Sequence, residues 1–377
     1  MRFALVLPLM ACGLQSATAP GGLLCDRIHV TSGDLAADLA AAKPNDCVIL
    51  TTGTYTGAFE LPVDVSLAGA TNSTVLLKGD GSGKPVLTIR GGRRSTVRGV
   101  KIDSSGGNGV AIDPGPANLV GVVVAGNTSH DALTSTCTRG ACEEVVLEDC
   151  ELGTSTVGLL VSGGRVRMVR GNISGMGGSA LSDGSGVVAS SGADVKLEQV
   201  TIENNAQVGV LVDGAATHVT LDQSVVRGNL ERGVWIQSSD GGVSITGGAI
   251  TGNRLVGVGI RESEAVRLTG VEISGTQLVE VPTGIAQKEN VGDGVGLFTG
   301  ARDVVLDMVR ATSNGRAQIL ADACGPGIRV TAPEVSGGQF RIVVQRGAAT
   351  VDAPAALVDD PGRVLATKSE KVPVAQQ

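Results

Sequence analysis

Aromatic and imidazole side chains are scarce in this chain. Its 377 residues include one tryptophan, one tyrosine, four phenylalanines and three histidines. Surfaces that bind nucleic acids combine basic stripes with aromatic side chains that stack on bases. The sequence has no such combination, and its net charge is −7 with a pI of about 5.1. We therefore predict that nucleic acids are not partners of this protein.

Long apolar runs are also missing, apart from a short one at the N-terminus. Phe3–Ala11 is too short to span a bilayer, and it leads into Leu9-Met10-Ala11-Cys12. This segment resembles a bacterial lipoprotein signal, which implies removal of the preceding residues and acylation of Cys12. Residues 1–19 are then a signal segment and linker, and a lipid anchor in the bacterial cell envelope is the only expected membrane attachment. The alternative is cleavage after Ala17-Thr18-Ala19, which leaves a secreted protein.

A repeat of 24 residues fills the middle of the chain, between Val195 and Ile260. Equivalent positions hold glycines and asparagines: Gly209, Gly233 and Gly257, and Asn205, Asn229 and Asn253. Each repeat contains three short runs of alternating apolar side chains, separated by Gly, Asn or charged turns, with no helical stretch between them. A fixed period of this length is typical of a solenoid, and the strand alternation indicates a β-solenoid.

These repeats resemble the parallel β-helix repeats of the pectate-lyase-like superfamily. The resemblance implies an all-β fold, a single-stranded right-handed parallel β-helix, over residues 25–346. A short helix over Leu35–Lys43, capped by Ser32 or Asp34, is expected to cover the N-terminal end of the coil. Residues 347–377 are expected to form a loosely ordered tail. Because this fold carries lyases, hydrolases, epimerases and adhesins, it does not name an activity.

Six cysteines follow Cys12, an even number that suits disulfides in an exported chain. Two disulfides are expected, Cys25–Cys47 around the predicted helix and Cys137–Cys142 within one loop. Cys150 and Cys324 lie too many turns apart to pair, so they are expected to be buried thiols. Neither the cysteines nor the histidines have the spacing of a zinc site. We predict no metal and no cofactor; Ca²⁺ becomes a candidate only if the chain is a lyase.

A row of polar residues marks one turn in successive repeats: Ser105, Asn127, Ser155, Asn205, Asn229, Asn253, Gln277 and Asn314. Stacked amides hydrogen-bond along a coil, so we expect this row to be structural. Two insertions interrupt the period, Ser135–Glu144 and Val279–Asp293. In solenoids, such insertions gather on one face, which is often the binding face.

The strand after this turn forms the face on which enzymes of the superfamily usually keep their sites. The side chains expected to point outward from it are apolar or absent: Leu160, Val188, Leu211, Trp235, Gly259 and Gly296. Enzymes that act on uronides need ionisable groups there, so this row argues against the usual enzyme. Trp235 is predicted to offer an exposed indole on which a sugar ring stacks. The alternative is that Trp235 packs beneath the insertion at 279–293.

The next outward position holds Asp213, Gln237 and Arg261, stacked at the strand spacing of about 4.8 Å. One interpretation is a hydrogen-bonded row on the surface. The other is a subsite for a charged sugar, to which the neighbouring Glu231 and Arg232 contribute.

Asp131 is a candidate catalytic residue at the start of this face. Asn127-Thr128-Ser129-His130-Asp131 is similar to the place where polygalacturonase-like enzymes carry an Asn-Thr-Asp motif. The later Gly-His-Gly and Arg-Ile-Lys are missing, as are the Asp-Pro-His-Asp of alginate epimerases and the Arg-x-Pro-x-x-Arg of pectate lyases. The resemblance therefore implies a role only for Asp131, and Arg261, several turns away, is the second candidate.

Three functions remain open. The first is an envelope-anchored, monomeric β-helix protein that binds a polysaccharide or a cell-surface protein without catalysis. The second is a divergent polysaccharide lyase, glycoside hydrolase or epimerase that uses Asp131 and Arg261. The third is a structural spacer or a self-associating surface protein. The apolar outward row and the missing catalytic motifs favour the first.

Overall fold

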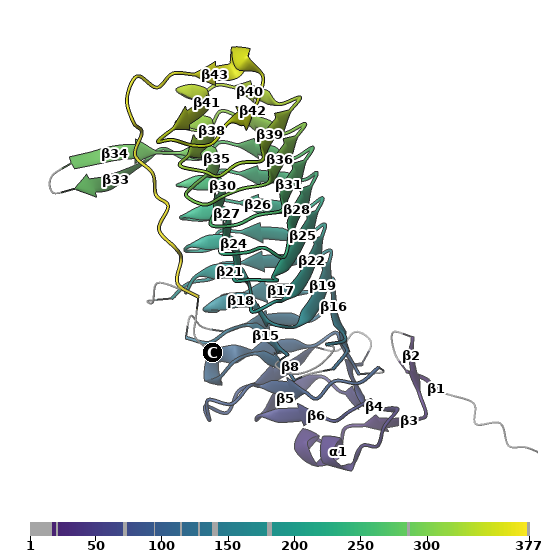
Figure 1. The fold of residues 1–377 in the computed structure, drawn as a ribbon. Coiled ribbons are helices and arrows are strands. Elements are labelled where there is room, and N and C mark those ends of the chain that lie inside the picture. Colours follow the sequence, from purple (N-terminus) through teal and green to yellow (C-terminus); the bar gives the residue numbers. More distant parts are fainter. Residues whose placement is uncertain are drawn as a thin grey trace, which may run out of the picture.

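The strands of this protein stack into a long right-handed coil with three faces (Figure 1). The structure is a computed structural model and describes residues 17–19, 22–70, 74–93, 95–113, 115–126, 129–137, 142–178, 183–284 and 287–374. Parallel sheets of 14, 12 and 13 strands form the faces, which we call faces 1, 2 and 3. The predicted parallel β-helix is confirmed.

Face 1 consists of β3 (Arg27–Val30), β4 (Asp46–Leu50), β7 (Ser66–Gly69), β10 (Thr96–Arg98), β13 (Ala117–Val120), β16 (Glu144–Glu148), β19 (Arg165–Val169), β22 (Asp194–Glu198), β25 (His218–Asp222), β28 (Val243–Thr246), β31 (Val266–Thr269), β36 (Val304–Asp307), β39 (Ile328–Thr331) and β42 (Val351–Asp352). Face 2 consists of β5 (Gly53–Thr56), β8 (Val75–Lys78), β11 (Lys101–Asp103), β14 (Val123–Ala125), β17 (Glu151–Gly153), β20 (Asn172–Ser174), β23 (Thr201–Glu203), β26 (Val225–Arg227), β29 (Ala249–Thr251), β32 (Glu272–Ser274), β37 (Arg310–Thr312) and β40 (Glu334–Ser336). Face 3 consists of β6 (Phe59–Leu61), β9 (Leu87–Ile89), β12 (Val110–Ile112), β15 (Leu133–Thr136), β18 (Val157–Ser162), β21 (Ser185–Ser190), β24 (Val208–Asp213), β27 (Arg232–Gln237), β30 (Val256–Arg261), β35 (Asp293–Leu297), β38 (Ala317–Asp322), β41 (Phe340–Gln345) and β43 (Val358–Asp359). The remaining elements are β1 (Ala17–Ala19), β2 (Leu23–Cys25), α1 (Leu35–Ala41), the 3₁₀ turns Ser104–Gly106 and Ala355–Leu357, and the hairpin strands β33 (Val279–Gly284) and β34 (Gln287–Val291).

Residues one repeat apart are direct neighbours in the stack. Val219 pairs with Val243 on face 1, and Val234 pairs with Val258 on face 3. Because every second side chain of a strand points inward, Val, Leu and Ile from the three faces fill one continuous core along the coil. The in-register stacking expected from the repeat is confirmed.

Buried asparagines tie successive turns together between faces 2 and 3. The side-chain amide of Asn205 donates to Asn229 Oδ1, and that of Asn229 donates to Asn253 Oδ1, each over 2.9 Å. Each Oδ1 also accepts a backbone N–H, from Asn205 for Asn229 and from Asn229 for Asn253. All three residues are fully buried. This row therefore satisfies polar groups inside the coil.

The predicted membership of this row is wrong by one residue at two turns. Ser104 and Thr276 are the buried residues there, whereas Ser105 and Gln277 are exposed. The backbone N–H of Thr276 donates to Asn314 Oδ1 over 3.0 Å, which links Thr276 to the next member of the row. Asn127 lies outside the described residues.

Glycines beside this row allow the turns to approach each other. A Cβ atom at Gly233 would lie 2.5 Å from the carbonyl oxygen of Gly257 and 2.7 Å from Asn253 Nδ2. Gly209 and Gly294 are equally crowded by the next turn. The repeated glycine is therefore required by close backbone approach.

The helix α1 and a disulfide close the N-terminal end. Asp34 caps α1 by accepting the N–H of Ala37 over 3.1 Å, and Leu35 and Leu39 are buried against the first strands. The helix ends at Ala41, two residues before the predicted Lys43. The expected Cys25–Cys47 disulfide is present. Within the described residues, no helix combines the length and the apolar character needed to cross a bilayer.

The other cysteines also lie where the sequence predicts. Cys137 and Cys142 form the second disulfide, which closes their loop. Cys150 and Cys324 are free thiols in the interior. Burial raises the pKa of the Cys150 thiol to about 11, so this thiol is unreactive at neutral pH.

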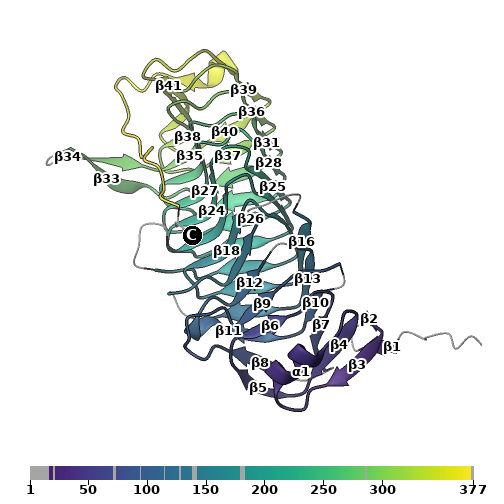
Figure 2. The same ribbon diagram turned by 60° about the horizontal axis from the view of Figure 1, so that its bottom comes forward.

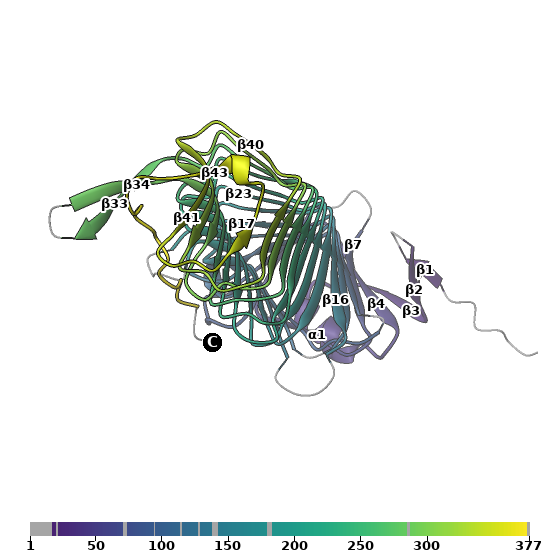
Figure 3. The same cartoon turned by 45° about the horizontal axis from the view of Figure 1, so that its top comes forward.

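Two segments outside the coil lie near face 3. The insertion after Gly257 forms the antiparallel hairpin of β33 and β34, which projects from the coil (Figure 3). The C-terminal tail leaves β43 and runs back along face 3 toward the middle of the coil (Figure 2). Leu365 and Val372 of this tail are only 5% and 4% exposed. The expected loosely ordered tail therefore differs from the structure, in which the tail packs against the coil.

Candidate ligand-binding site on face 3

Face 3 carries a second apolar layer on its outer side. Leu211, Trp235, Gly259, Gly296 and Leu320 are neighbours in register across five strands. The outward orientation predicted for this row is therefore correct. The outer apolar layer also contains Val281 and Val291 of the hairpin and Leu365 and Val372 of the tail. Both segments thus cover the row.

Trp235 is fully buried in this outer layer, so the predicted exposed indole is wrong. Its ring lies 5.6 Å from that of Phe298, and its Nε1–H donates to Gln237 Oε1 over 2.8 Å. A Cβ atom at Gly259 would lie 2.2 Å from the indole, which explains the glycine there. The alternative, packing beneath the 279–293 insertion, is correct in part, because the tail completes the cover.

The polar row beside it is longer than the sequence suggests. The row begins with Asp213, Gln237 and Arg261. The equivalent positions on the following strands hold Phe298, then Asp322 and Gln345. Gln237 Nε2 donates to Asp213 Oδ1 over 2.8 Å, so these two side chains meet as predicted. Arg261 instead pairs with Glu262 at 2.9 Å.

Arg232 and Glu231 form a pair next to the tryptophan. Arg232 is 3% exposed, its guanidinium lies 4.5 Å from the Trp235 ring centroid, and it contacts Glu231 at 2.7 Å. Burial lowers the pKa of Arg232. Within the described part of the chain, its Nε has no hydrogen-bond partner. A cavity of about 230 Å³ beside it is closed on the other side by Lys368, Glu370 and Lys371 of the tail.

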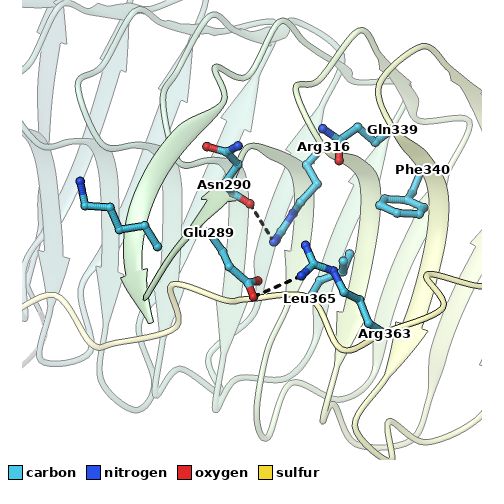
Figure 4. Close-up of a pocket in the computed structure, with 8 residues that line it drawn as sticks. Glu289, Asn290, Arg316, Gln339, Phe340, Arg363 and Leu365 are labelled. Atoms are coloured by element: carbon cyan, nitrogen blue, oxygen red, sulfur yellow. Dashed lines mark hydrogen bonds and ion pairs between the residues drawn. The ribbon is translucent and has the colours of Figure 1, made fainter. Parts of the chain in front are cut away.

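A larger cavity of about 690 Å³ opens between the hairpin, the tail and the last strands of face 3 (Figure 4). Charged and amide side chains line it, together with one aromatic ring: Lys288, Glu289, Asn290, Arg316, Gln339, Phe340, Arg363 and Leu365. The Lys288 and Arg363 side chains are 69% and 71% exposed. Figure 4 shows Arg363 directed toward Glu289, from which it is separated by 3.6 Å.

Arg316 forms the floor of this cavity and joins its three walls. It is 3% exposed and makes a bidentate pair with the fully buried Asp293, with distances of 2.9 and 2.5 Å. Its Nη1 also donates to the carbonyl oxygens of Asn290 in the hairpin and Ala366 in the tail. Arg316 thus ties the hairpin and the tail to the coil, while the exposed Lys288 and Arg363 pair with Glu280 at 2.6 Å and with Glu289 at 3.6 Å at the rim of the cavity.

Asp131 and Arg261 do not share a site. Asp131 precedes β15 and Arg261 ends β30, and four strands of face 3 lie between these two. Five strand spacings separate the two positions by about 24 Å. Two catalytic side chains must reach the same bond of a substrate, and a separation of about 24 Å is too large for that. Asp131 and Arg261 therefore do not line a common groove.

Asp131 has a different acidic neighbour. Burial, with a smaller contribution from the charge of Asp183, raises the pKa of Asp131 to about 6, against the lowering effects of the Val157 N–H and of His130. The sequence does not point to Asp183, because this residue lies in the irregular repeat around 171–186. The signal that could have revealed it is its position, two residues before a strand of face 3, like that of Asp131.

The family of the chain follows from its repeats. A family model described as "Right handed beta helix region" matches residues 86–278 and 185–336, which together span more than half of the chain. The chain belongs to this right-handed β-helix family. A search of curated proteins finds no significant match.

Several solved structures have the same fold as this β-helix protein. The A-module of the Azotobacter vinelandii mannuronan C-5 epimerase AlgE4 has 14% sequence identity and a TM-score of 0.54, with 90% of this chain and 98% of that chain covered. The AlgE6 A-module of the same organism has 15% identity and a TM-score of 0.50, with the same coverage. The Dettilon tailspike protein gp208 has 15% identity and a TM-score of 0.50, over 82% of this chain and 63% of that chain. At these identities the similarity establishes the fold alone.

Metal ligands do not gather on the described surface of the β-helix. Among the residues that the structure describes, no group of three or more His, Cys, Asp or Glu side chains is placed to hold an ion. The 690 Å³ cavity presents the cations of Lys288, Arg316 and Arg363, the carboxylate of Glu289, two amides and one phenyl ring. Such a set binds anionic and hydroxylated ligands through charge and hydrogen bonds.

Proposed function

We propose that this exported β-helix protein binds an acidic polysaccharide, without catalysis, at the cavity between the hairpin and the tail. The proposal rests on the lining of the cavity of about 690 Å³. Exposed cations lie there beside two amides and the half-buried phenyl ring of Phe340. Lys288 and Arg363 are suited to sugar carboxylates. Asn290 and Gln339 are suited to hydroxyl groups, and Phe340 to the apolar face of a sugar ring.

Two further observations support this function. The outer layer of face 3 is apolar and covered, so the place where enzymes of the superfamily usually carry ionisable groups holds Trp235, Gly259 and Gly296. Two of the similar folds belong to proteins titled as mannuronan epimerases, which act on a polysaccharide. The fold is compatible with that ligand class, although the fold by itself assigns no activity.

The polysaccharide test uses residues 20–377 with acidic and neutral polymers, in the presence and absence of calcium. We expect retention of acidic polymers with no change in their length or uronate composition. Lys288→Ala combined with Arg363→Ala should weaken binding by about fivefold or more, since each exposed charge contact contributes up to about 1 kcal/mol. Arg329→Ala, an exposed cation on face 1, is the matched control. Equal binding by wild type and the double variant would overturn the proposed site.

The raised pKa of Asp131 favours a second candidate, a divergent polysaccharide lyase, hydrolase or epimerase. A carboxyl group with a pKa of about 6 is suited to general acid or base catalysis near neutral pH, and Asp183 is the neighbouring carboxylate. The same assay decides between the two candidates. Shortened chains or altered composition that disappear with Asp131→Asn would replace binding by catalysis as the function.

Anchoring in the bacterial cell envelope remains part of the proposal and depends on Cys12, which lies outside the described residues. We expect Cys12→Ser to abolish incorporation of a labelled fatty acid and to release the protein from the membrane fraction. A wild-type protein that is already soluble and begins after Ala19 would favour secretion instead.

A further inference from the structure

The C-terminal tail is held against face 3 by contacts to its main chain. We use the name strap for residues 363–374. The strap follows the half-buried Pro361 and the exposed Gly362 and crosses the outer side of face 3 from β41 back to β27 (Figure 1). It contains no helix or strand, so its contacts with the coil position it.

Two buried glutamines of face 3 bind the strap in the same way. Gln345 Nε2 donates to the carbonyl oxygen of Leu365 over 3.0 Å, and the N–H of Leu365 donates to Gln345 Oε1 over 2.7 Å. Gln237 makes the same two bonds with Val372, over 2.7 and 2.8 Å. Each carboxamide thus satisfies both main-chain groups of one strap residue, as a neighbouring β-strand would. This pattern is specific for peptide backbone.

The spacing of the glutamines requires an extended chain. Gln237 and Gln345 occupy equivalent positions of β27 and β41, with β30, β35 and β38 between these strands. Four strand spacings correspond to about 19 Å. Seven residues lead from Leu365 to Val372, and an extended chain of that length spans at most about 25 Å. A helical segment would span about 10 Å and would reach only one glutamine.

The surface between the glutamines fits the side chains of such a peptide. Leu365 and Val372 are buried in the outer apolar layer, whereas Val364, beside Leu365, is 57% exposed. Further contacts lie along the strap: Ala366 O accepts from Arg316, Ala366 N–H donates to Glu289, and Lys371 pairs with Glu262 at 2.9 Å. The surface therefore selects for apolar residues seven positions apart.

We propose that the outer side of face 3 is a binding groove for an extended peptide, which the strap fills in cis. A partner chain with two apolar residues seven positions apart takes the groove when the strap lifts off at Pro361 and Gly362. The partner is a peptide because Gln237 and Gln345 each pair with an N–H and a carbonyl oxygen of the same residue. The strap also contributes Arg363 and Leu365 to the wall of the larger cavity, so its release would open that cavity as well.

The test keeps the full chain and cuts the strap only after folding. A specific protease site replaces Pro361 and Gly362, which are at the surface, and the purified protein is nicked there. A fluorescent synthetic peptide of residues 363–374 is then added to nicked and intact protein, and its anisotropy is followed. We expect saturable binding to the nicked protein, competition by unlabelled peptide, and at least a tenfold weaker response from the intact chain.

Peptide variants make the test specific without changing the protein. Leu365→Asp or Val372→Asp in the peptide should weaken binding at least tenfold, whereas Val364→Asp should leave it nearly unchanged. Equal loss from all three peptides, or no binding to nicked protein from which the strap has dissociated, would overturn the proposal. Trp235, the single tryptophan, reports occupancy, because its emission should shift to the red when the strap leaves.

Two other occupants of the groove give different results. A concentration-dependent dimer of the intact chain, lost with Val372→Asp in the protein, would assign the groove to a second copy and overturn the external peptide. A red shift of Trp235 emission on adding an acidic polysaccharide to the intact chain would assign the groove to a glycan. Polysaccharide binding without that shift leaves the peptide groove as proposed.

Discussion

The side chain of Asn229 hydrogen-bonds to both neighbouring turns of the coil. Its Oδ1 accepts from both the N–H and the side-chain amide of Asn205, and its Nδ2 donates to Asn253. Since all these atoms are buried, no water replaces a lost bond. Their pairing therefore depends on each turn having an amide at this position.

Replacing this amide should be costly. Asn229→Ala leaves the buried N–H and side-chain amide of Asn205 without their acceptor and removes one of the two hydrogen bonds to Asn253 Oδ1, so we expect the free energy of unfolding to fall by about 2–4 kcal/mol. Gln277→Ala, at an exposed amide in the equivalent turn two repeats later, should change it by less than about 0.5 kcal/mol. Urea titrations followed by far-UV circular dichroism measure both. Equal small effects would show that the row is dispensable.

The pH dependence of stability reports on Asp131. Its pKa of about 6 in the folded chain lies above the value of about 3.9 expected for an unfolded chain. The folded state therefore binds this proton more tightly, and the contribution to stability is full below about pH 4 and is lost as the pH rises through about 6. Asp131→Asn should remove this loss, so the stability of the variant relative to wild type should increase from pH 4 to pH 7. Denaturant titrations at each pH measure this difference in stability. Asp352→Asn is the control, because the Asp352 side chain is 82% exposed.

At the scale of elements, the sequence predicts what neighbouring repeats determine. The period, the outward direction of Trp235 and the capping helix follow from local patterns. The cover over Trp235 does not, because Gln237 and Val372 are separated by 135 residues and the strap has no period. The burial of a residue on a solenoid face depends on segments that cross it, and no repeat encodes these. The one-residue error at Gln277 has a local cause, because the repeat that leads to it has 23 residues in place of 24, as the pairing of Val243 with Val266 shows.

Arg316 joins the elements around the candidate cavity. Arg316→Ala leaves the fully buried Asp293 without its partner, so the free energy of unfolding should fall by about 3–5 kcal/mol. The strap also loses a hydrogen bond at Ala366, so Trp235 emission should shift to the red before global unfolding. Replacing both partners together, Arg316→Met with Asp293→Leu, should recover part of the stability. Arg165→Ala removes an exposed pair and should cost less than about 1 kcal/mol.

At the scale of the whole molecule, each turn of the coil contacts chiefly the turns above and below it. Stability in such a stack is close to a sum of turn and interface terms, and unfolding can start at an uncovered end. The N-terminal end is covered by α1, whose Leu35 and Leu39 belong to the long core. The middle of the coil is held in addition by the hairpin and the strap, which lie across several turns of face 3.

This arrangement predicts which turns lose stability when the capping helix α1 is weakened. Leu39→Ala removes a buried side chain at the end of the coil and should cost about 2–5 kcal/mol locally. Because the turns are coupled mainly to their neighbours, the loss should appear as faster hydrogen exchange in β4, β6 and β7 and not in β24 or β27. Val234→Ala, in the middle of the coil, should instead raise exchange in the turns on both sides. A uniform increase along the whole chain for Leu39→Ala would mean that the coil unfolds as one unit, with the strap and hairpin coupling distant turns more strongly than the stacked strands do.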